Sequence, residues 1–186
     1  MLLKNAVVYR DDFAPAEVNL EVTGERISSV DAGDAAGEAL DLAGCTLLPG
    51  FIDIHVHGCA GYDMGDGTPG ALRAMSDHLL HKGITSFCPT SMTLGADTLA
   101  RLFANVAACM GGEPGAYIQG INMEGPYIAP SKKGAQNAAF IRRPDKDEFR
   151  RLYDGCGGII RVVDIAPEVG GAEAFIRGGQ PDCPGC

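Results

Sequence analysis

The residues with the clearest chemical meaning lie in the run from Pro49 to Gly58, which reads PGFIDIHVHG. Side chains alternate between the two faces of a β-strand, so Asp53, His55 and His57 would share one face here. Two imidazoles at such positions, just before a glycine, can reach one metal ion, and their nitrogen donors suit zinc, iron, nickel or cobalt better than magnesium or calcium. The run therefore predicts a metal site at the end of a strand, with Asp53 as an orienting group below it.

A catalytic metal site commonly has three protein ligands, so the two histidines need a partner. Glu124 is the best candidate, because it ends a predicted strand and would reach the same edge of the sheet. Cys59 is a weaker candidate, since a buried thiol packs well without a metal. The alternatives are a hydrogen-bonded place in or near the core for the histidines and a solvated charge at a turn for Glu124.

The elements that must position these residues alternate after residue 50. The predicted strands are Phe51 to Val56, Ile84 to Cys88, Tyr117 to Met123 and Ile159 to Ile165. The predicted helices are one from Thr68 to Gly83, one whose apolar face holds Leu99, Leu102, Phe103, Val106 and Met110, and one from Asp145 to Tyr153. This order favours parallel strands with crossover helices, an α/β fold. The aliphatic side of the first strand, Ile52, Ile54 and Val56, suits a covering layer of helices.

The first fifty residues differ from the rest. Three short β-prone runs, Leu3 to Tyr9, Val18 to Val22 and Arg26 to Val30, are separated by turn residues. They predict a small β unit. The last residues, 178–186, read GGQPDCPGC and predict an unstructured tail. Cys183 and Cys186 have the spacing of a redox pair, but nothing follows them to form the helix that lowers the thiol pKa in such pairs.

Composition and charge exclude several classes of protein. Hydrophobic residues make up 46% of the chain and charged residues 21%, which is typical of a folded protein. The net charge of −9 repels nucleic acids and anionic membranes, and we find neither a membrane-spanning stretch nor a secretion signal. Seven cysteines without a framework spacing favour a reducing compartment, so we expect a cytoplasmic protein that binds no nucleic acid and no membrane. The 186 residues are too few for a complete eight-stranded α/β barrel, which needs roughly 250.

Five motifs occur in order along the chain: PGFIDIHVHG, PTS at 89–91, MEGPYI at 123–128, KKGAQNAAFIR at 132–142 and APE at 166–168. Together they resemble the N-acetylglucosamine-6-phosphate deacetylase family of the amidohydrolase superfamily, from about residue 1 to residue 177. The first motif alone indicates only an amidohydrolase. The EGP motif followed by KKGAQN narrows the resemblance to this family.

The resemblance implies a fold and a division of the chain. The fold would be an incomplete TIM-like (β/α)8 barrel of about four β/α units, preceded by a portion of a small β-sandwich-type domain. Residues 1–49 would form that portion, residues 50–177 the first half of a metal-dependent amidohydrolase barrel, and residues 178–186 the tail. The complete protein is expected to be a homodimer.

The resemblance also implies an activity. Such enzymes remove the acetyl group from the phosphorylated amino sugar N-acetylglucosamine 6-phosphate, giving glucosamine 6-phosphate and acetate. His55, His57 and Glu124 match the family's metal ligands, for a divalent metal expected to be zinc, with iron, cobalt or manganese as alternatives. Ala135 and Gln136 match its substrate-contacting pair, although Gln136 offers only a neutral amide where relatives can have histidine.

Parts of this assignment stay open. The proton-shuttling aspartate and two further histidine ligands would lie beyond residue 186, so we assign no catalytic residue within the chain. The alternatives are another amidohydrolase acting on a cyclic amide or a different N-acyl substrate, or a catalytically inactive truncation product. Asp164 receives no role, because Ala166 to Glu168 are the expected end of its strand. His78 and His81 are interpreted as surface or helix-end residues.

The basic residues around the loop after the EGP motif allow two interpretations. They are Lys132, Lys133, Arg142 and Arg143. They can attract a sugar phosphate electrostatically, or they can be solvated loop charges.

Overall fold

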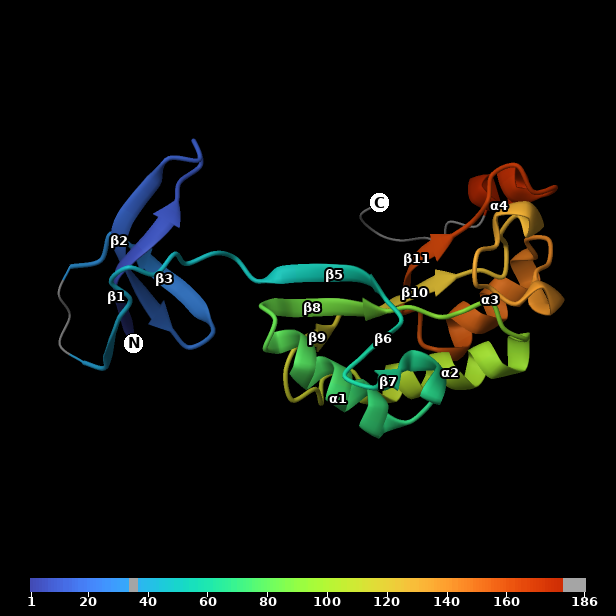
Figure 1. Cartoon of the computed structure of the whole chain (residues 1–186), viewed down its shortest axis with the longest axis horizontal. Coiled ribbons are helices and arrows are strands. Elements are labelled where there is room, and N and C mark those ends of the chain that lie inside the picture. Colours follow the sequence, from blue (N-terminus) through green and yellow to red (C-terminus); the bar gives the residue numbers. More distant parts are fainter. Residues whose placement is uncertain (34–36, 179–186) are drawn as a thin grey trace. The chain divides into compact units, whose positions relative to one another are not determined.

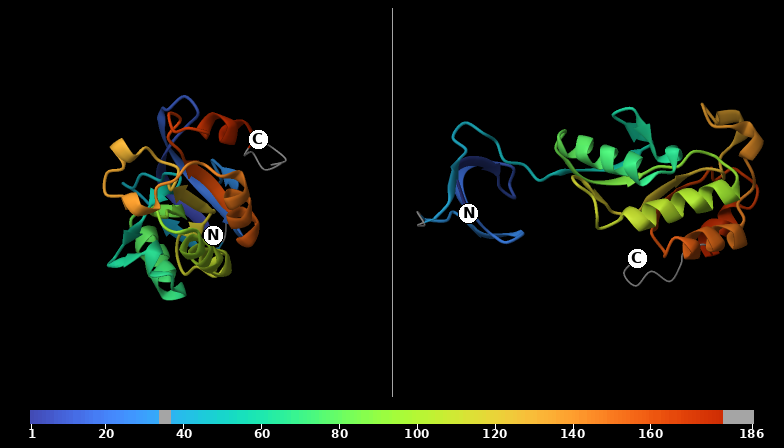
Figure 2. Two further views of the ribbon diagram at one scale, coloured as in Figure 1. Left: turned by 90° about the vertical axis from the view of Figure 1, so that its right-hand side faces the viewer. Right: turned by 90° about the horizontal axis from the view of Figure 1, so that it is seen from below.

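The computed structural model describes residues 1–33 and 37–178, shown as ribbons in Figures 1 and 2. The chain divides into two compact units, Met1–Pro49 and Gly50–Cys186. The predicted tail and its pair, Cys183 and Cys186, lie outside the described residues, apart from Gly178, which ends a helix. Within the described part of the chain, we find no helix with the length and apolar character needed to cross a bilayer.

The first unit is a four-stranded sheet in the order β3-β2-β1-β4. Its strands are β1 (Leu2–Tyr9), β2 (Pro15–Thr23), β3 (Arg26–Val30) and β4 (Ala39–Asp41). The first three strands pair antiparallel, whereas β4 lies parallel to β1. Sequence reasoning missed β4, because its three residues are all exposed and give no alternating pattern.

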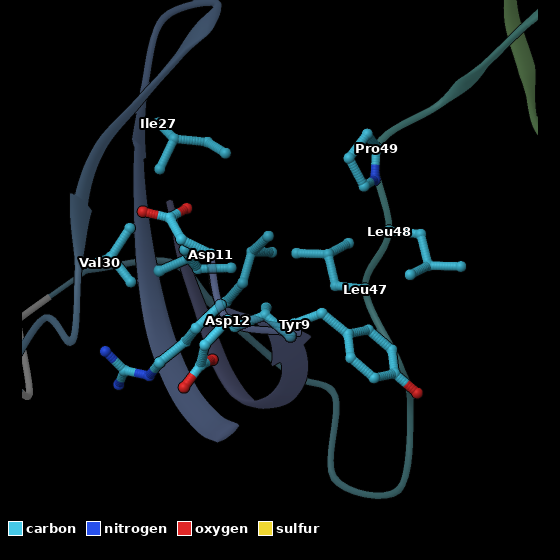
Figure 3. Close-up of a pocket in the computed structure, with 12 residues that line it drawn as sticks. Tyr9, Asp11, Asp12, Ile27, Val30, Leu47, Leu48 and Pro49 are labelled. Atoms are coloured by element: carbon cyan, nitrogen blue, oxygen red, sulfur yellow. The ribbon is translucent and has the colours of Figure 1, made fainter. Parts of the chain in front are cut away.

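A pocket of about 850 Å³ opens on this small sheet, lined entirely by residues of the first unit. In Figure 3, Leu47 from the segment that follows β4 points toward the strands that carry Ile27 and Val30, whereas Leu48 points the other way. His55, His57 and Glu124 are not among the residues that line this pocket.

The second unit contains the alternating strands and helices. Its parallel strands are β5 (Phe51–Val56), β8 (Ile84–Pro89), β9 (Tyr117–Ile118), β10 (Ile121–Glu124) and β11 (Ile160–Asp164). Its helices are α1 (Pro69–Leu80), α2 (Ala96–Cys109), α3 (Lys146–Gly155) and α4 (Ala172–Gly178). A small hairpin of β6 (Gly58–Cys59) and β7 (Tyr62–Asp63) follows β5, and short 3-10 helices span Met64–Asp66, Pro130–Lys132 and Ala138–Phe140. The predicted α/β fold with parallel strands is confirmed.

Two sheets meet in this unit, as Figure 1 shows. One has the order β5-β8-β9 and the other pairs β10 with β11. A bridge between Thr90 and Asn122 links β8 to β10, so the ends of β5, β8 and β10 come together.

Local sequence accounts for the helices. Thr68 caps α1, since its hydroxyl accepts a hydrogen bond from the Ala71 backbone, and Pro69 fits the first turn. The Asp145 carboxylate caps α3, and the backbone N–H of Glu148 holds the pKa of this carboxyl below its usual value.

The predicted apolar face of α2 is buried at Leu99, Leu102, Phe103 and Val106.

Two strand-level expectations are wrong in detail. The predicted strand from Tyr117 to Met123 is two strands, because Gly120 has a φ of 150° and the chain changes partners there, from β8 to β11. The expected helix cover of β5 is also incomplete. Val56 packs against the core, but Ile52 is 66% exposed and Ile54 57%, because β5 is the outer strand of its sheet.

Candidate metal centre

His55, His57 and Glu124 come together at the carboxyl ends of their strands. His55 lies on β5, His57 directly follows it, and Glu124 is the last residue of β10. Ligand atoms from these three side chains all lie within 4.8 Å of one another. The Glu124 Oε2 atom is 2.9 Å from His57 Nε2 and 3.7 Å from His55 Nε2. The two imidazole rings stand nearly perpendicular, at 86°.

Thr90, from the PTS motif, fixes the proton on His57. The His57 Nδ1 atom is 3.1 Å from the Thr90 carbonyl oxygen, which can only accept a hydrogen bond. In the neutral ring Nδ1 therefore carries the proton, and Nε2, which lies 2.9 Å from the Glu124 carboxylate, keeps its lone pair. The Thr90 hydroxyl also accepts a hydrogen bond from the Val56 backbone, at 2.9 Å, which holds the end of β5 in place.

This arrangement fits a bound cation. The Nε2 lone pair of His57 and the Glu124 carboxylate oxygen would repel each other at 2.9 Å without a positive charge near both. The same Glu124 oxygen is buried and has no hydrogen-bond donor. Two imidazole nitrogens and one carboxylate oxygen form a donor set that zinc and similar divalent metals favour.

His55 is held differently from the predicted scheme. Within the described residues Asp53 makes no hydrogen bond to the His55 ring; its carboxylate accepts a hydrogen bond from the His55 backbone, at 3.0 Å. The ring nitrogen Nδ1 faces Asn122 Nδ2 at 3.1 Å and Asp164 Oδ2 at 3.4 Å. Asp53 thus shapes the backbone, and the ring has other neighbours.

Asp164 is the residue that sequence reasoning missed. It ends β11, where the parallel register places it opposite Glu124, whereas the sequence predicted a strand to Ile165 with Ala166 to Glu168 at its end. The usable signal is the common end of parallel strands, because an acid at the end of β11 must lie beside an acid at the end of β10.

Cys59 does not join the cluster. Its thiol points toward the Met75 carbonyl, at 3.9 Å, and burial raises the thiol pKa. A raised pKa disfavours the thiolate form that binds metals.

The glycine of the EGP motif has a steric role. Gly125 has a φ of 71°, a conformation that side chains other than glycine rarely adopt. A Cβ there would also collide with the Thr93 side chain. This glycine lets the chain turn directly after Glu124.

The loop after the EGP motif places Ala135 and Gln136 differently. Ala135 is exposed, whereas Gln136 is only 5% exposed, and its side-chain oxygen accepts a hydrogen bond from the Thr93 backbone at 2.6 Å. Lys133 donates to the Gln136 carbonyl at 3.1 Å. The Gln136 side chain thus ties this loop to the loop that follows β8.

The other singled-out residues lie away from the cluster. His81 caps the C-terminus of α1 and His78 lies in its last turn, as the sequence predicts. Arg142 is bound to Glu148, with its Nε 2.9 Å from Oε2, so its positive charge is paired with a residue of helix α3. Lys132 remains exposed.

The amidohydrolase family profile matches residues 46–171. The chain belongs to this family. This amidohydrolase is 37% identical over 130 residues to N-acetylglucosamine-6-phosphate deacetylase of Bacillus subtilis (strain 168), covering 68% of the chain and 33% of that protein. It is also 37% identical over 132 residues to N-acetylgalactosamine-6-phosphate deacetylase of Escherichia coli O157:H7, covering 70% of the chain and 35% of that protein.

A solved structure gives the same likeness. The crystal structure of N-acetylglucosamine-6-phosphate deacetylase from Pasteurella multocida matches with a TM-score of 0.84 and 26% identity, covering 94% of this chain and 46% of that one. The amidohydrolase chain thus spans about a third of the length of the curated relatives (33% to 35%) and less than half of the solved one.

Proposed function

We propose that this chain supplies the first half of a metal-dependent amidohydrolase that removes the acetyl group from N-acetylglucosamine 6-phosphate. The observation that carries the proposal is the convergence of His55, His57 and Glu124 on one point. The names of the relatives, which match in sequence and in structure, support the choice of substrate. The products are glucosamine 6-phosphate and acetate.

His55, His57 and Glu124 would hold one divalent metal ion. Zinc suits this donor set best, and iron, cobalt or manganese are the alternatives. When bound, the metal would lower the pKa of a water molecule and polarise the acetamide carbonyl. Thr90 keeps the proton of His57 on the nitrogen that points away from the site, and Glu124 supplies a negative charge to balance the cation.

The loop after β10 would contact the sugar. We assign Ala135 and Gln136 to this contact, with exposed Ala135 presenting its backbone to the substrate. Gln136 would set the position of the loop, because its side-chain oxygen is bound to Thr93. The base that takes the proton from water would come from the part of the protein that follows this chain in its longer relatives.

The fold proposal follows from the same likeness. Residues 50–177 would form about four β/α units of an eight-unit barrel, and residues 1–49 a portion of a β-sandwich-type domain. The complete protein would be a homodimer.

A second substrate is favoured by one observation, the 37% identity to N-acetylgalactosamine-6-phosphate deacetylase. The two sugars carry the same acetamide and phosphate groups and differ in the configuration of one hydroxyl. The metal centre acts on the acetamide, so it serves both sugars equally well.

The test is acetate release by a protein in which this chain is extended to the length of its relatives. We expect release from N-acetylglucosamine 6-phosphate, with loss after chelation and recovery on adding zinc. N-acetylgalactosamine 6-phosphate, unphosphorylated N-acetylglucosamine and the cyclic amide dihydrouracil complete the panel. Hydrolysis of dihydrouracil alone, or of no substrate with any divalent metal, would overturn the proposal.

The metal site can be tested on the 186-residue chain itself. His57→Ala and Glu124→Ala should each weaken zinc binding by more than the roughly 10–100-fold that residues behind the ligands contribute. His81→Ala, a histidine at the end of α1, is the matched control and should leave the zinc Kd unchanged. Equal zinc affinity for all the variants would show that these residues do not hold the metal.

A further inference from the structure

Two groups with opposite hydrogen-bonding character face the same nitrogen of His55. Asn122 Nδ2, a donor, is 3.1 Å from His55 Nδ1, and the Asp164 carboxylate oxygen, an acceptor, is 3.4 Å from it. A neutral imidazole has one N–H and one bare nitrogen, so the group that binds Nδ1 decides the state of Nε2. Nε2 is the atom that faces Glu124.

Asn122 alone would select the wrong form of His55. Its NH2 group donates to the Ile54 carbonyl at 3.0 Å, which keeps the nitrogen, not the oxygen, turned toward His55. If Nδ1 accepted the second hydrogen of this amide, the imidazole proton would lie on Nε2. That nitrogen would then have no lone pair for a metal.

Asp164 has the opposite effect. Its Oδ2 atom is buried 3.4 Å from His55 Nδ1 and makes no hydrogen bond within the described residues, so it keeps an unused acceptor beside that nitrogen. With the proton on Nδ1, the lone pair of Nε2 points toward Glu124. The two ring nitrogens are separated by one carbon and their in-plane directions diverge, so Asp164 approaches Nδ1 and leaves Nε2 to Glu124.

We propose that Asp164 is a positioning residue that holds the proton of His55 on Nδ1 and so turns a bare Nε2 toward the metal site. This inference rests on the proposed function, in which His55 is a metal ligand. Carboxylates behind metal-binding histidines generally fix the tautomer in this way. Asp164 thereby does for His55 what the Thr90 carbonyl does for His57.

The first test measures the tautomers directly in the metal-free 186-residue chain, by nitrogen NMR of histidine labelled with ¹⁵N. Both His55 and His57 should carry the proton on Nδ1. In Asp164→Leu, His55 should change to the Nε2–H form, because only Asn122 still faces Nδ1. His57 is the internal control and should not change. If His55 stays in the Nδ1–H form in Asp164→Leu, the proposal is wrong.

The second test separates the hydrogen bond from the charge. Asp164→Leu should raise the zinc Kd roughly 10–100-fold. Asp164→Asn also removes the charge but keeps an acceptor oxygen, so it should lose less affinity. Asp53→Asn removes one charge near the same strand without contacting the ring, and His55 should keep its Nδ1–H form. Equal losses in Asp164→Leu and Asp164→Asn would assign the effect to charge alone and overturn the proposal.

The failure of this inference can be told apart from the failure of the proposed function. If His57→Ala leaves zinc binding intact, the metal site itself is wrong. The NMR measurement needs no metal, so it still reports whether Asp164 sets the tautomer of His55. Far-UV circular dichroism of each variant identifies any that has lost its fold, and Asp164→Asn, which has the same shape as the native side chain, keeps the comparison available.

Discussion

Thr90 links the two residues at the end of β5 through separate atoms. Its hydroxyl accepts a hydrogen bond from the Val56 backbone N–H, and its carbonyl oxygen lies within hydrogen-bond distance of His57 Nδ1. The hydroxyl also donates to the Cys88 carbonyl at 3.2 Å. The PTS motif is thus more than a strand end, because its threonine positions the histidine that directly follows the neighbouring strand β5.

Thr90→Val should therefore destabilise the fold. Valine has nearly the same shape but no hydroxyl, so the Val56 N–H would lose the acceptor that the buried Thr90 side chain provides. This loss should lower the free energy of unfolding by about 1–3 kcal/mol. Urea unfolding followed by circular dichroism measures the change. Thr85→Val is the control, since the Thr85 hydroxyl is on an exposed residue and its bond to Phe51 is long, at 3.5 Å. An equal effect at both positions would show that burial of the hydrogen bond is unimportant.

At the same scale, the sequence predicted the chemistry of the site better than its supporting contacts. Strand alternation put His55 and His57 on one face, and the end of the next predicted strand but one singled out Glu124. The role of Asp164 could not be predicted, because it depends on where β11 ends and on its register with β10. The anchoring of Gln136 on Thr93 also joins residues that are far apart in the sequence, and no local pattern encodes such a contact.

At the scale of elements, the sequence predicts the periodic segments. It does not predict the point at which the chain changes from pairing with one strand to pairing with another. The apolar face of α2 is buried as its spacing requires. The run from Tyr117 to Met123 looks continuous in sequence, yet Gly120 divides it. A Cβ at Gly120 would lie 2.6 Å from the Ile159 carbonyl oxygen, so the close approach of β11 requires glycine there. That approach is a tertiary contact, which propensity cannot show.

The attachment of α3 depends on a largely buried ion pair. Glu148 is 12% exposed and Arg142 27%, and Glu148 also accepts a hydrogen bond from the Tyr127 hydroxyl at 2.9 Å. Burial, followed by the charge of Glu148, raises the pKa of Tyr127, so this phenol stays neutral and acts as a donor. Glu148 therefore accepts hydrogen bonds from two side chains, Tyr127 and Arg142, of the segment between β10 and α3.

Glu148→Leu should cost about 3–5 kcal/mol in the free energy of unfolding, because it leaves the Arg142 charge without its partner. Glu173→Leu is the matched control. Glu173 also pairs with an arginine, Arg177, but both side chains are more than three-quarters exposed, at 79% and 78%. Exposed pairs contribute about 0–1 kcal/mol. Thermal or urea unfolding of both variants measures the difference, and a similar small loss in each would contradict this account of α3.

At the scale of the whole molecule, the net charge of −9 opposes an anionic substrate. The sugar phosphate proposed above as the substrate would then have to be attracted by local cations rather than by the overall field. Arg142 is occupied by Glu148, and Lys133 donates to backbone carbonyls of its own loop. Lys132 and Lys133 nonetheless bring positive charge to the loop that also carries Ala135 and Gln136. Phosphate attraction therefore remains an expectation for this loop.

The molecule also exposes apolar side chains on an open strand. In the described part of the chain β5 pairs only with β8, which leaves its other edge without a partner strand. Phe51, Ile52 and Ile54 on this strand are each more than half exposed, at 61%, 66% and 57%. An unpaired strand edge with exposed apolar side chains favours pairing with a second copy of the chain.

The 186-residue chain should therefore self-associate at high concentration, as measured by light scattering during size-exclusion chromatography. Ile52→Lys combined with Ile54→Lys should weaken the association at least roughly tenfold, about 1.4 kcal/mol, because charge on an edge strand opposes pairing. These side chains point away from the face that carries His55, so zinc binding should persist in the double variant. Ile176→Lys is the control, because Ile176 is 50% exposed on α4, a helix with no open edge. A chain that stays monomeric at all concentrations, or that loses association equally with Ile176→Lys, would show that the edge of β5 does not drive assembly.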